Sequence, residues 1–191
     1  NGDSIYPVLN MLNTKYFIFP WEGGQTVPIQ NPYVYGNAWL VDKLSYVNNS
    51  NEEMDAVGKI DLRHEAVADA KFKEQLGEAV VQDTASTVQI TGYEPNRLNY
   101  EVNSGKGGVL VFSEIYYPGW TATVDGEPVE LGRVNYILRA MNIKPGKHQV
   151  ELAFFPKTVK TTETIAYVAY VLLLLLMIGM GIMYWRKKKE A

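Results

Sequence analysis

The feature that most constrains this chain is an uncharged apolar stretch near its C-terminus. Residues 165–184 read IAYVAYVLLLLLMIGMGIMY, twenty positions without a charged side chain. As an α-helix, with a rise of about 1.5 Å per residue, the stretch spans roughly the 30 Å thickness of a bilayer's hydrocarbon core. A helix that is apolar on every face lies in a large protein core or in a membrane. We therefore expect one transmembrane helix over residues 165–185.

The residues that follow the apolar stretch predict how this helix is oriented. Clustered positive charge beside a membrane span faces the cytoplasm, and aromatic side chains gather at membrane–water interfaces. We therefore expect residues 1–164 to be extracytoplasmic and residues 186–191 to form a basic cytoplasmic tail. The predicted membrane-interface residues are Tyr184, Trp185, Arg186, Lys187, Lys188 and Lys189.

Charge and residue content exclude several classes of function for the rest of the chain. Four basic residues and Glu190 give the segment after residue 185 a net charge of +3, which leaves −6 elsewhere because the whole chain carries −3. An acidic domain has no electrostatic footprint for nucleic acid. The chain has no cysteine and two histidines, His64 and His148. Disulfides and thiol chemistry are therefore excluded, and a histidine-rich metal site is not expected.

Residues 1–85 predict a small α+β region made of short elements. Residues 15–20 (KYFIFP) are an apolar run of β-forming residues that Pro20 ends, and residues 21–32 are rich in turn formers. Ser50 followed by Glu53 matches a capping box, which predicts a helix that ends near Gly58. The remaining predicted elements are a helix over 4–12, a strand over 38–47 and a second short helix over 66–76.

Residues 86–156 have the pattern of an antiparallel β-sandwich. The clearest signal is Asp125-Gly126 between two alternating runs, which favours a two-residue type I′ hairpin because both turn positions need φ > 0. Pro128 places the strand after that turn at a sheet edge. The other predicted strands are two alternating runs within 86–104 and strands over 107–118, 134–143 and 147–156. We expect a mainly β, jelly-roll-like sandwich, followed by a juxtamembrane linker over 157–164.

Tyr116, Tyr117 and Trp120, in the segment SEIYYPGW, are the candidate carbohydrate contacts. Aromatic rings on a β-surface can stack on the faces of sugars. The alternative is that the three rings pack the sandwich, since large aromatic side chains dominate the energetics of protein cores. The sequence alone leaves both interpretations open and weights the second more heavily.

No catalytic, metal or cofactor site is predicted in this chain. Asp125, Glu127 and Glu130 form a carboxylate cluster, but a glycosidase needs a pair about 5–10 Å apart across a cleft, and Asp125 belongs to a tight turn. The sequence contains no nucleophile elbow, phosphate-binding loop, dinucleotide-binding motif or zinc-protease motif. His64 lies between two charged residues and is predicted to be on a solvated face.

Several segments taken together resemble the C-terminal region of the bacterial YfhO family of multi-spanning membrane proteins. They are LNTKYFIF (12–19), GNAWLVDKL (36–44), SEIYYPGWTATVDGEPV (113–129), NYILRAMNIKPGKHQVEL (135–152) and FFP (154–156). That family resembles GT-C-type glycosyltransferases, which have many membrane helices, a lipid-linked sugar donor and an extracytoplasmic active site. The resemblance implies a bacterial inner-membrane protein whose catalytic acid lies in an N-terminal loop outside this chain.

Three functions are compatible with these observations. The first is an accessory, non-catalytic domain of a membrane glycosyltransferase that acts on cell-envelope glycans or lipids. Its partners would be the lipid bilayer, a lipid-linked sugar and an envelope glycan. The second is a membrane-anchored carbohydrate-binding module, and the third is a structural or assembly module without enzyme activity. No cofactor and no nucleic-acid partner is expected in any of the three cases.

Overall fold

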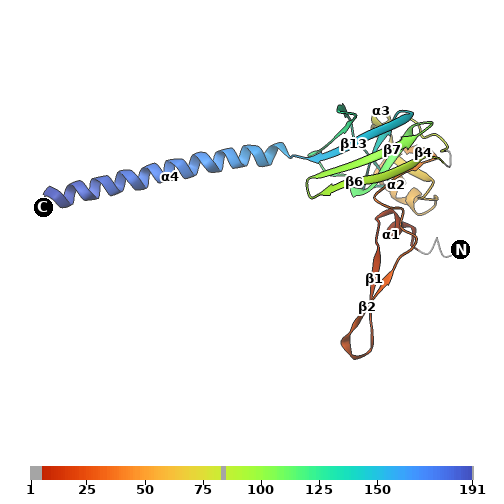
Figure 1. Cartoon of the computed structure of the whole chain (residues 1–191), viewed down its shortest axis with the longest axis horizontal. Helices are drawn as coiled ribbons and strands as arrows, with labels where there is room; N and C mark the ends of the chain where they lie inside the picture. The colour runs from red at the N-terminus through yellow and green to blue at the C-terminus, as the bar shows by residue number, and fades with distance from the viewer. Residues whose placement is uncertain (1–5, 83–84, 191) are drawn as a thin grey trace. The chain divides into compact units, whose positions relative to one another are not determined.

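The computed structural model describes residues 6–82 and 85–190, and the chain divides into two compact units, Asn1–Phe154 and Phe155–Ala191. The first unit is built mainly from antiparallel β-sheets (Figure 1). The second unit contains one long apolar helix. The predicted mainly β fold with a single C-terminal apolar helix is therefore confirmed.

Two sheets of the first unit form the β-sandwich. The larger sheet has the strand order β10-β9-β13-β7-β6, and the smaller sheet has the order β11-β12-β8-β3. The strands are β3 (Ala38–Val41), β6 (Thr87–Glu94), β7 (Arg97–Ser104), β8 (Gly108–Ile115), β9 (Trp120–Val124), β10 (Glu127–Val129), β11 (Gly132–Val134), β12 (Leu138–Ile143) and β13 (Gly146–Phe154). The chain crosses from one sheet to the other after β7, β8, β10 and β12, so consecutive strands repeatedly change layer.

The inner faces of the two sheets enclose a shared core. Tyr100 of β7 contacts Phe112 of β8 across it, with ring centroids 5.2 Å apart and both residues fully buried. Burial alternates along β7, as the period-two pattern in the sequence predicts. Asp125 and Gly126 have φ of 53° and 86°, which is the predicted type I′ turn. β10 lies at the sheet edge, where Pro128 is tolerated.

The smaller sheet is buried on both of its faces. Val109, Leu110, Val111 and Phe112 of β8 have no exposed surface. Leu110 and Phe112 belong to the core between the sheets, whereas Val109 and Val111 belong to a second core on the opposite face. A strand covered on both sides reads as a continuous apolar run, which explains why the sequence of β8 does not alternate.

A β–α–β unit covers the outer face of the smaller sheet. β4 (Lys43–Val47) pairs in parallel with β5 (Glu65–Asp69), and α2 (Ser50–Val57) lies in the connection between them. Ala66, Val67 and Ala68 of β5 are buried in the second core. The first unit therefore has three layers, which are the larger sheet, the smaller sheet and the β–α–β motif formed by β4, α2 and β5.

The structure corrects two secondary-structure predictions for this region. The segment 66–76, predicted as a helix, begins in strand β5, and only its second part is helical, as the 3-10 turn η3 (Ala70–Phe72) and the short helix α3 (Lys73–Leu76). The alanines that favour a helix in isolation are small residues that a parallel strand buries on both sides, so tertiary packing overrides propensity. The segment 38–47, predicted as one strand, is divided at Asp42 into β3 and β4, which join different sheets.

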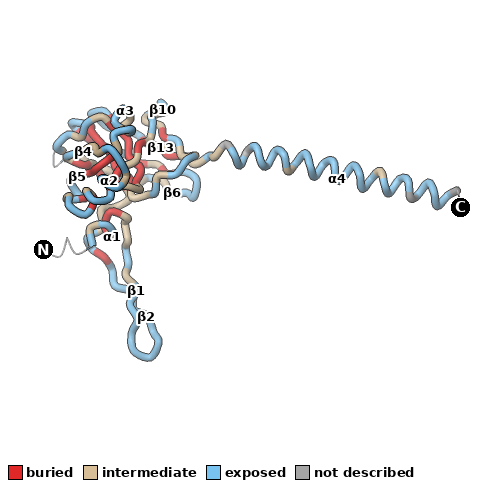
Figure 2. The backbone as a smooth tube through the Cα atoms, turned by 180° about the vertical axis from the view of Figure 1, so that it is seen from behind, coloured by how far each residue is buried: buried red, intermediate tan, exposed pale blue. Residues whose placement is uncertain are grey.

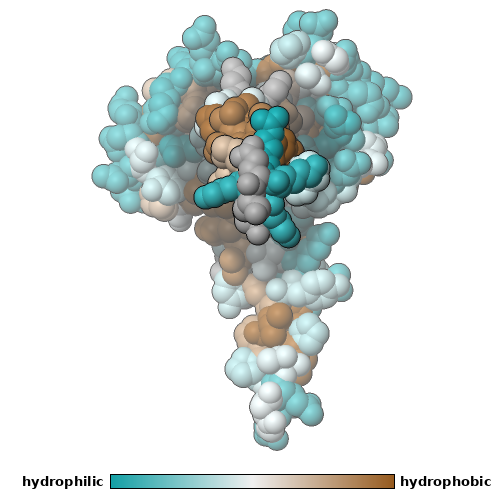
Figure 3. Space-filling model, turned by 90° about the vertical axis from the view of Figure 1, so that its left-hand side faces the viewer, coloured by the Kyte–Doolittle hydropathy of each residue, from teal (hydrophilic) through white to brown (hydrophobic). Residues whose placement is uncertain are grey.

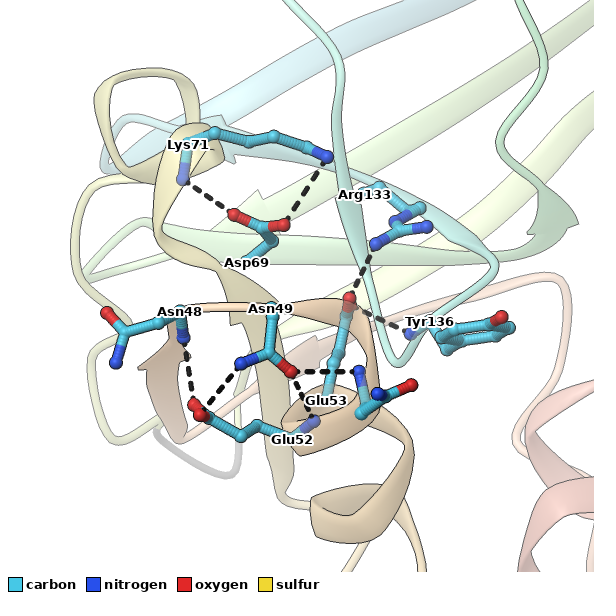
Figure 4. Close-up of polar contacts among 9 residues, drawn as sticks. Asn48, Asn49, Glu52, Glu53, Asp69, Lys71, Arg133 and Tyr136 are labelled. Atoms are coloured by element: carbon cyan, nitrogen blue, oxygen red, sulfur yellow. Dashed lines mark hydrogen bonds and ion pairs between the residues drawn. The ribbon is translucent and has the colours of Figure 1, made fainter.

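The N-terminus of α2 is capped one residue earlier than the sequence pattern predicts. Asn49, not Ser50, is the N-cap, and its side chain accepts hydrogen bonds from the N–H groups of Asn51 and Glu52. Glu52 rather than Glu53 reaches back, accepting from the backbone N–H of Asn48 (Figure 4). The helix ends at Gly58, as predicted.

Glu53 is thereby free to point inward and join α2 to the smaller sheet. Its carboxylate is fully buried, accepts a 2.6 Å hydrogen bond from Arg133 Nη2 and accepts a second from the N–H of Tyr136 (Figure 4). Asn135 and Tyr136 have φ of 50° and 71°, so the chain turns here. The single strand predicted over 134–143 is therefore two strands, β11 and β12, joined by a tight turn that Glu53 holds.

A two-stranded hairpin extends from the rest of the first unit (Figure 1). It consists of β1 (Tyr16–Pro20) and β2 (Thr26–Gln30), joined through η2 (Glu22–Gly24). The predicted strand over 15–20 is thus confirmed, whereas the turn-rich segment 21–32 contains a second strand. At the base of the hairpin, α1 (Pro7–Met11) is a shorter helix than the one predicted over 4–12, whose first two residues lie outside the described residues.

The second unit is formed by α4 (Lys157–Glu190). Its segment Thr161–Lys189 has a mean hydropathy of 2.5 in its most apolar window and is long enough to cross a bilayer. Among the described residues it is the one helix with this property. The residues predicted as a juxtamembrane linker, 157–164, belong to the first two turns of this helix.

Candidate functional site

The three aromatic residues singled out in the sequence lie at one end of the sandwich, where β8 passes to β9. Trp120 is the first residue of β9, and Tyr116 and Tyr117 lie in the connection that precedes it. Gly119 makes the bend possible because its φ of 105° lies in a region that other residues rarely adopt. The connection thus turns sharply and brings Tyr117 and Trp120 to the same end of the fold.

Tyr117, Trp120 and Phe154 form an aromatic cluster. The ring of Phe154 lies 5.2 Å from that of Trp120 and 6.2 Å from that of Tyr117, measured between centroids. Tyr117 is 62% exposed, whereas Trp120 is half-buried. Tyr116 points elsewhere and packs against Phe72 at 5.7 Å. The structure therefore brings two of the three candidates together and gives Tyr117 the most accessible ring.

Arg139 of β12 supports this cluster from inside the sandwich. Its guanidinium carbon lies 4.0 Å from the centroid of the Trp120 ring, and one of its nitrogens pairs with the carboxylate of Glu114 on β8. Arg139 is only 1% exposed, and burial lowers the pKa of its guanidinium in spite of the neighbouring Glu114. A cation held in this position attracts the electron-rich face of the indole and fixes its orientation.

Unsatisfied polar atoms lie at this end of the core. Arg139 Nε and Nη1 and the Tyr100 hydroxyl are buried without a hydrogen-bond partner among the described residues. Burial, chiefly through desolvation, raises the pKa of the Tyr100 hydroxyl well above its usual range, so Tyr100 stays neutral. Buried polar groups are normally paired, so these three atoms make this part of the core unusually polar.

Two open pockets flank the aromatic cluster, and Tyr117 and Trp120 line both of them. One, of about 650 Å³, extends over Tyr116, Phe72 and the edge strand β10. The other, of about 560 Å³, extends over Ile115, Glu114 and Arg139. The surface therefore offers two adjoining hollows separated by aromatic rings, a shape that suits an elongated ligand with flat apolar faces and polar edges.

The carboxylates at these pockets are not arranged for glycoside hydrolysis. Glu130 lines the first pocket and Glu114 lines the second. Glycosidases need two carboxyl groups across one cleft, one of them available as an acid. Glu114 is instead committed to its pair with Arg139.

Residues 56–166 of this chain match a family model described as bacterial membrane protein YfhO. The match covers more than half of the chain. The chain belongs to the YfhO family. The resemblance seen in the sequence is thereby confirmed, and the matched YfhO region contains the whole sandwich apart from β3, including the aromatic cluster. No curated protein and no solved structure matches this chain.

Both histidines of this YfhO-family chain are paired with aspartates in the same way. His64 Nδ1 lies 2.7 Å from Asp42 Oδ2, and His148 Nδ1 lies 2.7 Å from Asp125 Oδ2. The second oxygen of each aspartate accepts a backbone N–H, from Gln82 and from Gln149 respectively. These amide hydrogen bonds are the main reason why the pKa of each aspartate lies below its usual value.

The acidic residues that were considered in the sequence have separate positions. Asp125 occupies the type I′ turn and holds His148, whereas Glu127 is on the edge strand β10 and Glu130 follows that strand. Within residues 6–82 and 85–190, no group of three or more His, Cys, Asp or Glu side chains is placed to hold a metal ion. Asp42 and His64 line a smaller open pocket of about 390 Å³ with Arg63.

The predicted membrane-interface residues of the YfhO-family chain occupy the last turns of α4. Trp185 is exposed, and Lys189 Nζ lies 3.7 Å from the centroid of its ring. Arg186, Lys187 and Lys188 are exposed at the helix C-terminus, where positive charge complements the helix dipole. The side chain of Tyr184 lies outside the described residues.

Sequence reasoning missed Arg139, Glu114 and Phe154, which complete the aromatic cluster. The available signal was Arg139 itself, a single charged residue in the otherwise apolar segment LRAM. A charge in a buried strand is costly unless it is paired, so such a residue indicates a partner in space. The sequence does not show which carboxylate that partner is.

Proposed function

We propose that this chain is the extracytoplasmic domain and a membrane-spanning helix of a multi-spanning YfhO-family glycosyltransferase. In this proposal the domain binds a cell-envelope glycan or glycolipid and guides it toward an active site formed elsewhere in the protein. The chain supplies no catalytic residue of its own. The lipid-linked sugar donor and the transfer reaction belong to the membrane-embedded part.

The observation that carries the glycan-binding part is the cluster of Tyr117, Trp120 and Phe154 between two open pockets. An aromatic ring offers a flat apolar face to the C–H groups of a pyranose ring, and a polar rim bonds its hydroxyl groups. Tyr117 supplies the exposed ring, and Arg139 and Glu114 hold Trp120 in a fixed orientation beside it.

The proposed sidedness rests on charge. Arg186, Lys187, Lys188 and Lys189 directly follow the uncharged stretch that ends at Trp185, whereas the rest of the chain carries a net charge of −6 because the whole carries −3 and the tail +3. Basic residues beside a span remain on the cytoplasmic side. Residues 1–164 are therefore assigned to the extracytoplasmic side of the bacterial inner membrane.

Sidedness can be tested with single cysteines, because the natural chain has none. Gln89→Cys places a thiol on the exposed face of β6, and Lys188→Cys places one in the basic tail. A membrane-impermeant maleimide added to intact spheroplasts is expected to label position 89, and to label position 188 only after lysis. The reverse pattern would overturn the assignment.

Glycan binding is tested with the whole chain in lipid nanodiscs and a panel of neutral and anionic envelope oligosaccharides. Tyr117→Ala is expected to weaken binding about tenfold, which corresponds to about 1.4 kcal/mol. Tyr93→Ala is the matched control, because Tyr93 is 68% exposed on β6 and lies outside the two pockets. Equal losses for the two variants, or no binding by the natural chain, would favour a structural or assembly module instead.

A further inference from the structure

The hairpin β1–β2 has almost no contact with the rest of the first unit. Every residue of β2 is exposed, and so is every residue of β1 except the half-buried Phe17 (Figure 2). An isolated two-stranded hairpin is at best marginally stable in water, because it has too little surface to bury. Its exposure therefore calls for something that covers it.

The hairpin is apolar on both of its faces. In the register Ile18↔Pro28 and Phe19↔Val27, alternate residues point to opposite sides. Ile18 is 71% exposed on one side, and Phe19 is exposed on the other. Figure 3 shows apolar side chains midway along the hairpin and paler, more polar residues toward its tip.

Charge is almost absent from this element. Between Tyr16 and Tyr33 the sole charged residue is Glu22. The tip carries Trp21, which is 64% exposed, next to Gly23 and Gly24. Tryptophan at the end of an apolar element is typical of the membrane–water interface, where its amphipathic ring lies at the level of the lipid headgroups.

The strand edges are poorly suited to pairing with another β-strand. Pro20 lies at the end of β1, and Pro28 lies in the middle of β2. Proline has no N–H to donate, so it weakens a strand edge as a template for a further strand. A second copy that extends the sheet, or a partner that adds a strand, is therefore disfavoured relative to a partner that contacts side chains.

The base of the hairpin is held firmly in the first unit. Asn31 Nδ2 donates to Asn10 Oδ1 at 2.8 Å and to the backbone carbonyl of Thr14 at 2.9 Å. Both asparagines are buried, and the N–H of Asn31 donates to the carbonyl of Lys15. The hairpin is thus an apolar projection fixed at its root.

Only a short segment connects the first unit to the candidate membrane span. The candidate span begins at Thr161, and residues 155–160 connect it to the last strand of the first unit. Residues 157–160 are already helical, so the connection is shorter than the roughly 20 Å that six extended residues would span. A first unit tethered this closely to a span meets lipid headgroups at high local concentration.

We propose that the β1–β2 hairpin inserts its tip into the interfacial region of the bilayer, with lipid as its partner. Trp21, Ile18 and Phe19 enter the headgroup and upper acyl region, and Asn10 and Asn31 hold the base. The outer N–H and C=O groups of a two-stranded hairpin lack partners, so the hairpin stays in the hydrated interface and does not cross the hydrocarbon core. This inference does not depend on glycan binding.

The test uses the whole chain reconstituted into phosphatidylcholine vesicles, with a nitroxide label on single cysteines at Ile18, Phe19 or Gln89. Oxygen concentrates in lipid and a water-soluble nickel complex concentrates in water, so the ratio of their relaxation effects reports contact with lipid. We expect that ratio to be at least threefold higher for Ile18→Cys and Phe19→Cys than for Gln89→Cys. Because binding is apolar, adding phosphatidylglycerol or 0.5 M salt should leave the ratios unchanged.

Two results would overturn the proposal. Labels at positions 18 and 19 that are as accessible to the nickel complex as the label at 89 would place the hairpin in water. Labels that are shielded from both reagents would place it against protein, either another segment or a second copy. Far-ultraviolet circular dichroism of each labelled chain, matching that of the natural chain, confirms that the label has not unfolded the domain. Position 19 gives an independent reading if substitution at 18 disturbs the hairpin.

Discussion

The guanidinium of Arg139 lies 4.0 Å from the centre of the Trp120 ring and is paired with the Glu114 carboxylate. These three side chains come from three strands, β12, β9 and β8, so they tie the larger sheet to the smaller one where the sandwich opens. The pair has a positioning role: it fixes the indole against which Phe154 packs. The accessible aromatic surface thus depends on an ion pair in which Arg139 is buried and Glu114 is partly exposed.

A double-mutant cycle on Arg139 and Glu114 tests this dependence. Arg139→Met keeps the packing of the stem and leaves Glu114 without its cation, so unfolding free energy should fall by about 2 kcal/mol. Glu114→Gln should cost a similar amount. Chemical denaturation of the double variant should show a coupling of at least about 1 kcal/mol, because residues in contact are not additive. Strictly additive losses would show that the two side chains do not act as a pair.

Asp125→Asn isolates the charge of the turn from its geometry. Asparagine also tolerates the positive φ of a type I′ turn, so the hairpin is retained. The Gln149 amide and His148 hold the pKa of Asp125 below its usual value of 3.8. The carboxylate therefore stabilises the fold above about that pH, and this contribution is lost as the pH falls through the lower, folded-state pKa.

Thermal unfolding between pH 2 and pH 7 checks the sign of this effect. The natural chain should be more stable than Asp125→Asn at pH 7, and the difference should shrink once the pH is below about 3.8. Asp42→Asn should behave in the same way, because Gln82 and His64 lower the pKa of Asp42 by the same kind of contacts. A difference in melting temperature that is constant across the pH range would exclude an electrostatic origin.

Gly107 and Gly126 form a matched pair for measuring steric crowding. Both have positive φ, 72° and 86°. A Cβ added at Gly126 meets nothing within 4 Å, so Gly126→Ala should cost about 1 kcal/mol from backbone conformation alone. A Cβ at Gly107 would lie 2.5 Å from the carbonyl oxygen of Ile143, so the backbone must move. Gly107→Ala should lower the melting temperature clearly more than Gly126→Ala, and equal shifts would contradict the described loop.

Asn31→Ala should loosen the root of the hairpin without affecting the sandwich. It removes the donor to Asn10 Oδ1 and to the Thr14 carbonyl, at a local cost of about 1–3 kcal/mol. Hydrogen exchange followed by mass spectrometry should show faster exchange in 16–30 and unchanged exchange in β7 and β8. Faster exchange throughout the first unit would mean that the asparagine pair supports the whole fold.

Local patterns in the sequence were sufficient to predict the sandwich and the type I′ turn at Asp125-Gly126. Asp125-Gly126 requires positive φ at two successive positions, and alternation along β7 shows which side of the strand is buried. Such signals need only a few adjacent residues. The apolar helix is equally local, because its length and lack of charge are read directly from the chain.

Features that depend on distant residues were not predictable in the same way. Ala66–Ala68 form a strand because they pair with β4 and are buried in the second core. Asp42 separates β3 from β4, and its carboxylate accepts the amide of Gln82, forty residues away in sequence. Arg139 was visible as a charge in an apolar run, but its place beneath Trp120 results from the packing of two sheets. The second strand of the N-terminal hairpin was hidden by its prolines and turn formers.

The position of β3 has a consequence for the way the domain is made. β3 pairs with β8, and the second core combines side chains from Met11 to Ala140. A growing chain releases its N-terminal residues first, so Trp39 and its neighbours emerge long before β8 and β12 exist to cover them. The contacts that close this core are far apart in sequence, which makes the folding step slow. The second core therefore cannot close until β12 has been synthesised, and until then its N-terminal apolar side chains lack the strands that cover them.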